Sequence, residues 1–420
     1  MSEIRVNGCR PLSGEIKIQG SKNGALPMLA ASILQKGTIR FTNVPTIQDV
    51  SCMVGILESA GCVCRRQGDS LTVDASGVCS SVIPREYVGK MRSSILVMGA
   101  LLGRLGEAVT WYPGGCSIGS RPVELHLKAF SCLGAEVKEE EGRLEAFCTR
   151  LTGGRIHFPF SSVGATENAL LAAVLAEGRT VIEGAAREPE IESLCRLLNQ
   201  MGGRITGGGS SRICVEGVKC LHGTEFRVPG DRIAAGTYLA AIAAAGGRAR
   251  LWGAPWESME AVIRAFRACG GAVEPFASES EPFGGIEMRM ETRPHPLMLS
   301  TGPYPGFPTD LQSPMLAVLS LADGESRLKE NVFEGRFRTA GELCRMGAQI
   351  QVSGREAVIC GRPGLSGAGV KAWDLRGGAA LVAAALAAEG ETRISDCIHI
   401  ERGYEDICRD IRGLGGDIRN

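Results

Sequence analysis

One short pattern recurs six times along the 420 residues and constrains the fold more than any other feature. It consists of an apolar residue, a glycine, a small residue, a variable residue and a valine or isoleucine, with slight changes in the first copy. Its glycines are spaced by 73, 68, 68, 77 and 68 residues, at Gly61, Gly134, Gly202, Gly270, Gly347 and Gly415. A period of this length indicates that one supersecondary unit is repeated.

A second series of glycines lies upstream of the first, at Gly37, Gly106, Gly178, Gly246, Gly324 and Gly390. Each follows an Ala- and Leu-rich stretch and precedes a β-rich one, so we expect it to close a helix. Each unit then reads as strand, turn, apolar helix, glycine, strand, turn, amphipathic helix, glycine and strand. The first helix of each unit is apolar nearly all round, which is typical of a helix inside a core.

Six α/β units of about 70 residues divide into two domains of three units each. The stretch IKIQGSKNGALPMLAA (16–31) resembles FRVPGDRIAAGTYLAA (226–241), which places the boundary near residue 230. We expect one domain over 21–229 and a second over 1–20 plus 230–420. The first strand, within 1–20, then completes a sheet of the second domain. Two crossings between the domains would leave a cleft, the default place for a ligand.

The composition excludes several classes of function. Lys plus Arg and Asp plus Glu both total 46, which argues against nucleic acid or an anionic membrane as the main partner. The N-terminus has no secretory signal, and the Ala-rich run at 379–388 is too short to span a bilayer. We therefore expect a soluble, cytoplasmic protein without membrane insertion. The 16 cysteines form no C-x-x-C pair, and no zinc motif is present.

Polar residues gather at the turns that begin the predicted helices. Helix N-termini present N–H groups and a partial positive charge, so several of them together bind anions even on a protein without net charge. A phosphorylated substrate is the leading expectation. The turn residues are Lys22, Asn23, Arg92, Ser162, Asp231, Arg232, Asp310 and Arg376 before the first helices, and Cys116, Arg121, Arg187, Arg336 and Arg402 before the second helices.

The stretch WYPGGCSIGSRPVELH (111–126) carries an unusual cysteine. Cys116 lies among glycines rather than on an apolar face, and Arg121 favours a thiolate nearby. We expect a mobile loop over 111–121 that carries a reactive thiol.

Several stretches together resemble the enolpyruvyl transferase family. They are GSKNGALPMLAA, MRSSILVMGALL, PGGCSIGSRPVELH, SVGAT, REPEI, PGDRI, FPTDLQ, DLRGGAALV and HIERGY, in the family order over the whole chain. The resemblance implies an α/β fold of two similar inside-out α/β barrels built from six repeated units, with the active site in the interdomain cleft. It implies transfer of the enolpyruvyl group of phosphoenolpyruvate to the 3-hydroxyl of UDP-N-acetylglucosamine, with release of phosphate, and no metal or organic cofactor.

The resemblance also implies catalytic roles. Asp310 is the base that helps to deprotonate the sugar hydroxyl, although from the residues alone Thr-Asp before an apolar run favours a helix N-cap. Cys116 is the acid of the mobile loop and the target of the epoxide antibiotic fosfomycin. Lys22 and Arg402, with Arg121, hold the phosphate of phosphoenolpyruvate.

A further set of residues is expected to bind substrate. Arg92 and Arg376 engage phosphate or carboxylate, Asn23 contacts the sugar hydroxyl, and the turn at 162–164 holds the diphosphate. The chain departs from the family pattern at Phe160, which is often basic, and at Glu124, where aspartate is familiar. The complete set is Asn23, Arg92, Arg121, Pro122, Val123, Glu124, Leu125, Ser162, Val163, Gly164, Val332 and Arg376.

Two alternatives stay open on the sequence. One is a 3-phosphoshikimate 1-carboxyvinyltransferase-like enzyme, although QGSKNGALP replaces the Ser-rich turn expected there. The other is a non-catalytic paralogue that binds a nucleotide sugar, against which the joint presence of Lys22, Cys116, Asp310 and Arg402 argues.

Overall fold

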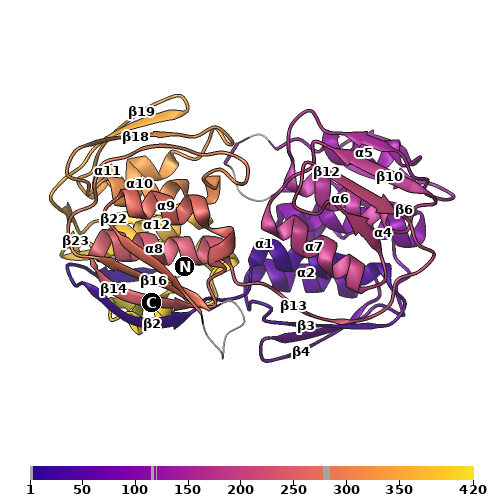
Figure 1. The fold of residues 1–420 in the computed structure, drawn as a ribbon, viewed down its shortest axis with the longest axis horizontal. Helices are drawn as coiled ribbons and strands as arrows, with labels where there is room; N and C mark the ends of the chain where they lie inside the picture. Colours follow the sequence, from indigo (N-terminus) through magenta and orange to yellow (C-terminus); the bar gives the residue numbers. More distant parts are fainter. Residues whose placement is uncertain (1–2, 115–117, 120, 278–283) are drawn as a thin grey trace. The chain divides into compact units, whose positions relative to one another are not determined.

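The computed structural model describes residues 3–114, 118–119, 121–277 and 284–420. It divides into two compact units. The first unit comprises Gly20–Cys116 and Arg121–Pro229, and the second comprises Met1–Gln19, Ser117–Ser120 and Gly230–Asn420. These bounds differ from the expected 21–229 and 1–20 plus 230–420 by residue 20 and by the segment 117–120. In each unit helices lie inside and strands lie at the periphery (Figure 1).

Within the described residues of the first unit, three buried helices and three amphipathic ones alternate along the chain. The buried helices are α1 (Lys22–Ala31), α4 (Leu96–Leu105) and α6 (Val163–Ala173). The amphipathic helices are α2 (Gln48–Ser59), α5 (Glu124–Cys132) and α7 (Pro189–Gln200). Short helical segments complete the set: η1 (Ser32–Leu34), α3 (Arg85–Val88) and η2 (Arg92–Ile95).

Three sheets surround these helices, in the strand orders β13-β3-β5-β4, β6-β8-β7 and β11-β12-β10-β9. Two of them contain one parallel pair each, β13 with β3 and β9 with β10. The strands are β3 (Thr38–Thr42), β4 (Val63–Gln67), β5 (Ser70–Asp74), β6 (Glu107–Trp111), β7 (Glu136–Glu140), β8 (Arg143–Phe147), β9 (Arg155–His157), β10 (Arg179–Glu183), β11 (Arg204–Thr206), β12 (Arg212–Glu216) and β13 (Glu225–Arg227).

The second unit repeats this arrangement. Its buried helices are α8 (Arg232–Ala245), α10 (Gln312–Leu319) and α12 (Leu375–Leu386), and every residue of α12 is buried. Its remaining helices are α9 (Glu260–Ala268), α11 (Arg338–Arg345) and α13 (Ile407–Gly413). The short helical turns are η3 (Trp256–Ser258), η4 (Thr309–Leu311) and η5 (Cys397–Arg402).

Three four-stranded sheets enclose the helices of the second unit, in the orders β15-β16-β14-β2, β17-β18-β20-β19 and β22-β24-β1-β25, beside the pair β21-β23. The strands are β1 (Ile4–Asn7), β2 (Leu12–Lys17), β14 (Gly247–Trp252), β15 (Ala272–Phe276), β16 (Gly285–Met290), β17 (Met298–Ser300), β18 (Glu325–Lys329), β19 (Gln349–Ser353), β20 (Glu356–Cys360), β21 (Leu365–Ser366), β22 (Gly369–Lys371), β23 (Ala388–Glu389), β24 (Glu391–Ser395) and β25 (Asp417–Arg419).

The N-terminal segment completes two of these sheets, as its sequence suggested. β1 pairs antiparallel with both β24 and β25, and β2 pairs parallel with β14, so that Leu251 lies opposite Ile16. β2 therefore takes the place in its sheet that β9 takes beside β10 in the first unit. The second unit needs residues from both ends of the chain to satisfy the backbone hydrogen bonds of its sheets.

The repeat glycines share one backbone conformation. All six, from Gly61 to Gly415, have φ between +79° and +104°, a region that favours glycine. Of the upstream glycines, only Gly106 and Gly246 are helix C-caps, because the other buried helices end several residues earlier. The sequence also missed one strand in each of the first five repeats: after the repeat glycine the chain forms a hairpin, for example β11 with β12 after Gly202. In the sixth repeat, β25 pairs with β1 instead.

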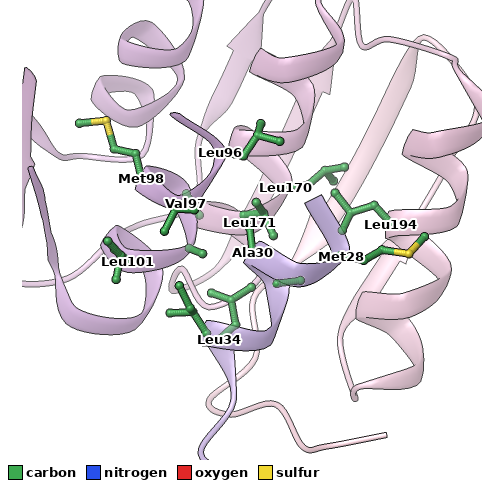
Figure 2. Close-up of a cluster of buried hydrophobic side chains, with 14 of the residues drawn as sticks. Met28, Ala30, Leu34, Leu96, Val97, Met98, Leu101, Leu170, Leu171 and Leu194 are labelled. Carbon is green, nitrogen blue, oxygen red and sulfur yellow. The ribbon is translucent and has the colours of Figure 1, made fainter. Parts of the chain in front are cut away.

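The helices of the first unit pack through aliphatic side chains. Figure 2 shows Met28 of α1, Val97 and Leu101 of α4, Leu171 of α6 and Leu194 of α7 in one buried cluster. Burial of a side chain of this size contributes about 1.5–3 kcal/mol. The apolar helices are therefore the core of each repeat, and the turns before them, which carry the polar residues, are set by that packing. Among the described residues no helix is long and apolar enough to cross a membrane.

Candidate active site

The predicted site residues of the first unit begin at the N-terminus of α1. Ser21 caps this helix and accepts a hydrogen bond from the backbone N–H of Gly24 at 3.1 Å. The ammonium group of Lys22 lies 2.9 Å from a carboxylate oxygen of Asp49, in the first turn of α2. The Asp49 side chain is only 5% exposed, so this ion pair is largely shielded from solvent. Asp49 therefore helps to fix the Lys22 side chain, and Asn23 is the next residue of α1. The sequence did not predict a role for Asp49.

Arg92 binds backbone carbonyls on both sides of the 114–120 stretch. Its guanidinium donates to the carbonyls of Pro113 (3.4 Å), Pro122 (3.3 Å) and Arg121. Burial, followed by the charge of Arg121, lowers the pKa of Arg92 to about 10, so Arg92 stays charged at neutral pH. In this structure Arg92 joins two parts of the backbone, Pro113 and 121–122. Cys116 lies outside the described residues.

The residues Pro122–Leu125, which are expected to bind substrate, lead into α5. The side chain of Val123 is fully buried in the core, so its own contribution to a ligand is limited to the backbone. Glu124 lies in the first turn of α5, where a negative charge stabilises the helix dipole. Leu125 is partly buried against the same core.

His126, which the sequence did not single out, lies buried behind this turn. Its Nδ1 is 2.7 Å from the amide nitrogen of Asn168 in α6, and the same amide nitrogen donates to the carbonyl of Ile95. An amide NH₂ is a donor only, so Nδ1 accepts and the imidazole is neutral. Burial, with the charge of Arg92, lowers the pKa of His126 to about 3.

The turn at 162–164 begins α6. The hydroxyl of Ser162 caps the helix by accepting a hydrogen bond from the N–H of Ala165 at 3.4 Å. A Cβ on Gly164 would lie 3.1 Å from the His126 ring, so the backbone approaches that ring closely. The first N–H groups of a helix have no acceptor within the helix, which leaves those of Val163 and Gly164 directed outward from its end. Nearby, Phe160 is 60% exposed.

In the second unit, Asp310 is held by two arginines. Its Oδ1 accepts from Arg336 Nη2 at 2.5 Å, and its Oδ2 accepts from Arg376 Nη2 at 3.1 Å and Nε at 3.3 Å. The arginine side chains are 4% and 3% exposed, against 24% for Asp310. Neither η4 nor α10 has a side-chain cap, so the helix-cap interpretation of Asp310 is wrong. Its carboxylate pairs with guanidinium groups instead.

Arg376 is the most enclosed of the predicted cations. It lies in the first turn of α12, which Asp374 caps by accepting hydrogen bonds from the N–H groups of Arg376 and Gly377. Burial alone would lower the pKa of Arg376, but Tyr404 and the carboxylates of Asp310 and Asp231 raise it above the usual value. Arg376 is therefore a permanent cation.

The remaining predicted residues of the second unit are less enclosed. Val332 is partly exposed, in a turn that the buried carboxylate of Glu330 fixes by accepting from the N–H groups of Val332 and Phe333. Glu330 also accepts from the hydroxyl of Thr309, next to Asp310. Arg402 is the last residue of η5 and is partly exposed.

The structure thus brings Asp310 and Arg376 together, adds Arg336 to them, and pairs Lys22 with Asp49. The sequence placed Arg336 at a turn before a predicted helix but did not assign it to the site. That position, before α11, is the feature by which it could have been found. Among the described residues no group of three or more His, Cys, Asp or Glu side chains is arranged to hold a metal ion.

Known proteins resemble this chain over its whole length. Residues 6–411 match the family model of EPSP synthase (3-phosphoshikimate 1-carboxyvinyltransferase). UDP-N-acetylglucosamine 1-carboxyvinyltransferase 2 of Caldanaerobacter subterraneus subsp. tengcongensis is 46% identical over 100% of this chain and 99% of its own length. UDP-N-acetylglucosamine 1-carboxyvinyltransferase of Nitratidesulfovibrio vulgaris and UDP-N-acetylglucosamine 1-carboxyvinyltransferase 1 of Staphylococcus aureus are both 44% identical, with the same coverage.

Solved structures show the same fold. An enolpyruvyl transferase from Streptomyces tendae has a TM-score of 0.88 at 24% identity and covers 99% of this chain and 98% of its own. EPSP synthase from Acinetobacter baumannii has a TM-score of 0.76 at 18% identity and covers both chains completely. The predicted enolpyruvyl transferase fold is confirmed, and the chain belongs to the EPSP synthase family of enolpyruvyl transferases.

Proposed function

We propose that this protein transfers the enolpyruvyl group of phosphoenolpyruvate to the 3-hydroxyl of UDP-N-acetylglucosamine and releases phosphate. This activity is that of a UDP-N-acetylglucosamine 1-carboxyvinyltransferase and is the first committed step of peptidoglycan precursor synthesis. The choice of acceptor rests on the full-length relatives of that name at 44–46% identity. Both substrates are small molecules of the cell interior, and a cytoplasmic location is part of the proposal.

One observation carries the chemistry: the Asp310 carboxylate, accessible on one side, with the buried guanidinium groups of Arg336 and Arg376 on the other. A carboxylate within reach of a hydroxyl is suited to act as a general base. Two adjacent cations favour its ionised form.

The other cations act on phosphoenolpyruvate. Lys22, Arg121 and Arg402 hold its phosphate, and Arg92 and Arg376 engage phosphate or carboxylate. Arginine forks match both groups in a bidentate manner, whereas lysine supplies a compact charge. The sugar oxygen adds to C2 of the enol while C3 gains a proton, which makes a tetrahedral intermediate. Loss of phosphate from C2 and of a proton from C3 restores the double bond and completes the transfer. Asn23, beside Lys22, contacts the sugar hydroxyl.

The nucleotide sugar is bound by the first unit. The N–H groups at the start of α6, at Ser162–Gly164, serve the diphosphate, since a helix N-terminus is an anion site. The segment Arg121–Leu125 lies along the uracil, and Val332 of the second unit contacts the substrate. Glu124 and Phe160 are the two positions where binding differs in detail from the family pattern.

Cys116 donates the proton to the methylene carbon of the enol. A loop thiol near Arg121 is also a nucleophile that fosfomycin alkylates. We therefore expect fosfomycin to inactivate the wild-type enzyme with time and to leave the Cys116→Asp variant active. If fosfomycin abolished phosphate release at the same rate in both proteins, this role of Cys116 would be contradicted.

The test of the proposed function is phosphate release from phosphoenolpyruvate, with UDP-N-acetylglucosamine as acceptor in one reaction and shikimate 3-phosphate in the other. We expect release with the nucleotide sugar alone, and its loss in Cys116→Ser and Asp310→Asn. Release with shikimate 3-phosphate instead would establish the alternative acceptor. Binding of nucleotide sugar without release of phosphate would indicate a non-catalytic binding protein.

A further inference from the structure

A chain of buried hydrogen bonds leads away from Arg376 on the side opposite Asp310. Arg376 Nη1 is 3.2 Å from the hydroxyl of Tyr404, which is 2.7 Å from the hydroxyl of Thr237 in α8. The Thr237 hydroxyl is 2.9 Å from the carbonyl of Ile233, one turn earlier. Tyr404 is 1% exposed and Thr237 is 2% exposed, so water has little access to these groups.

The direction of every hydrogen bond in this chain follows from its last member. The carbonyl of Ile233 only accepts, so the single proton of the Thr237 hydroxyl points to it. Thr237 must then accept the proton of the Tyr404 hydroxyl, and the Tyr404 oxygen presents a lone pair to Arg376. Hydrogen bonds that run in one direction strengthen one another in a low-dielectric interior. Tyr404 is therefore fixed as an acceptor for Arg376.

This acceptor determines which edge of the guanidinium faces Asp310. Nη1 is held by Tyr404, which leaves Nε and Nη2 for the Asp310 carboxylate. The guanidinium carbon also lies 5.6 Å from the centre of the Tyr404 ring, within cation–π range. Without the Tyr404 hydroxyl, the buried Nη1–H group of Arg376 would lose its acceptor. An unpaired buried donor is costly, so the guanidinium would rotate toward another acceptor.

We propose that Tyr404 is a positioning residue that acts through Arg376, holding the guanidinium in the orientation in which its Nε and Nη2 face Asp310. The importance of this orientation for catalysis rests on the proposed function, whereas the orientation itself does not. Tyr404 need not touch either substrate.

The chain supplies a matched control in Tyr238. Its hydroxyl is equally buried and donates to Asp410 at 2.6 Å, and its ring meets the Tyr404 ring edge-on at 6.4 Å. Tyr238→Phe removes a buried hydroxyl from the same cluster but leaves the path to Arg376 intact. If Tyr404 served stability alone, the two Phe variants would behave alike.

The first readout is kinetic. We expect Tyr404→Phe to raise the KM for phosphoenolpyruvate or to lower kcat by about tenfold, as for the loss of one buried hydrogen bond to a charged group. The KM for the nucleotide sugar should not change. Tyr238→Phe should match the wild type in all three constants. Thr237→Val should show a smaller effect than Tyr404→Phe, and Thr237→Ser, which retains the hydroxyl, should restore wild-type values.

The second readout does not depend on turnover. In ¹⁵N-arginine-labelled protein, the Nε–H resonance of Arg376, assigned by its absence in Arg376→Lys, should exchange with solvent about tenfold faster in Tyr404→Phe than in wild type or Tyr238→Phe. Unchanged exchange in Tyr404→Phe would overturn the proposal whether or not the enzyme turns over. Faster exchange with unaltered kinetics would overturn its catalytic part, and absence of wild-type turnover would count against the proposed function alone.

Discussion

The two units share one topology but begin their buried helices differently. In the first unit, α1 and α6 are capped by Ser21 and Ser162, each of which accepts one backbone N–H. In the second unit, the corresponding helices α8 and α12 are capped by Asp231 and Asp374, each of which accepts two. A serine leaves the partial positive charge of the helix N-terminus in place, whereas an aspartate largely neutralises it.

This difference in charge suits the two kinds of helix start to different groups. With neutral caps, helix N-termini in the first unit stay suited to an anionic ligand such as a diphosphate. In the second unit the caps are themselves anionic, and the positive charge is carried by Arg336 and Arg376, which face a carboxylate. The first unit is thus suited to hold an anionic part of a substrate, and the second presents a carboxylate that can act as a base.

The largest effect is expected from removing the base of the second unit. Asp310→Asn keeps the shape of the side chain but cannot accept the proton of the sugar hydroxyl. We expect kcat to fall by about 10²- to 10⁴-fold, the usual contribution of a general base. The measurement is the steady-state rate of phosphate release at saturating substrates. A loss below tenfold would mean that Asp310 only holds the two arginines.

The next largest effect is expected on stability at acid pH, because the first unit contains the buried neutral His126. Burial, with the charge of Arg92, lowers the pKa of His126 from about 6.5 in the unfolded chain to about 3 in the folded one, so the unfolded state binds more protons between these pH values. The free energy of unfolding therefore falls as pH drops below 6.5, by about 2 kcal/mol at pH 5.

Urea unfolding of wild type and His126→Gln at pH 7 and pH 5 measures this contribution. The stability of the variant should depend less on pH by about 2 kcal/mol over this interval. An equal pH dependence in both proteins would show that His126 is protonated in the folded state.

A smaller effect is expected when the neutral cap of α6, Ser162, is replaced by an anionic cap like those of α8 and α12. Ser162→Asp keeps a good cap but sets a carboxylate where the diphosphate is expected, so the KM for the nucleotide sugar should rise about tenfold or more through like-charge repulsion. Ser162→Asn, a neutral cap of nearly the same shape, is the control and should stay close to wild type. If both variants showed the same KM, the helix N-terminus would not hold the diphosphate.

The smallest effect is expected at Phe160. An exposed basic residue there adds one screened charge near the start of α6, so Phe160→Lys should lower the KM for the nucleotide sugar by a few-fold at most. Phe160→Gln controls for loss of the ring. The gain should disappear in 0.5 M salt, and a gain independent of salt would point to a packing effect instead.

The sequence predicted the features that follow from local pattern. The glycine series indicated repeated α/β units, and the all-round apolar stretches predicted the buried helices. The hairpin strands were missed because segments such as β5 (SLTVD) are short and follow the preceding strand after a turn of only two residues. Pairing with a strand far along the chain, as for β1 and β24, was foreseen only because 1–20 had no unit of its own.

The site was predictable where a residue's role shows in its neighbours along the chain. Thr-Asp before an apolar run is the local pattern both of a helix cap and of a catalytic base. The two interpretations of Asp310 are distinguished by its pairing with Arg336 and Arg376, which lie 26 and 66 residues away. His126 and Asp49 were missed for the same reason, since their partners lie on other helices. The assigned roles of Lys22, Arg402 and Cys116 stay predictions, and Cys116 lies outside the described residues.

The division of tasks between the units is tested most directly by titration calorimetry of UDP-N-acetylglucosamine into the Asp310→Asn variant. If the first unit binds the nucleotide sugar and Asp310 of the second removes the hydroxyl proton, the Kd should change by at most about tenfold, as for one hydrogen bond, although turnover is lost. Loss of detectable binding, in a variant that unfolds like the wild type, would contradict the division and make Asp310 a main determinant of nucleotide-sugar affinity.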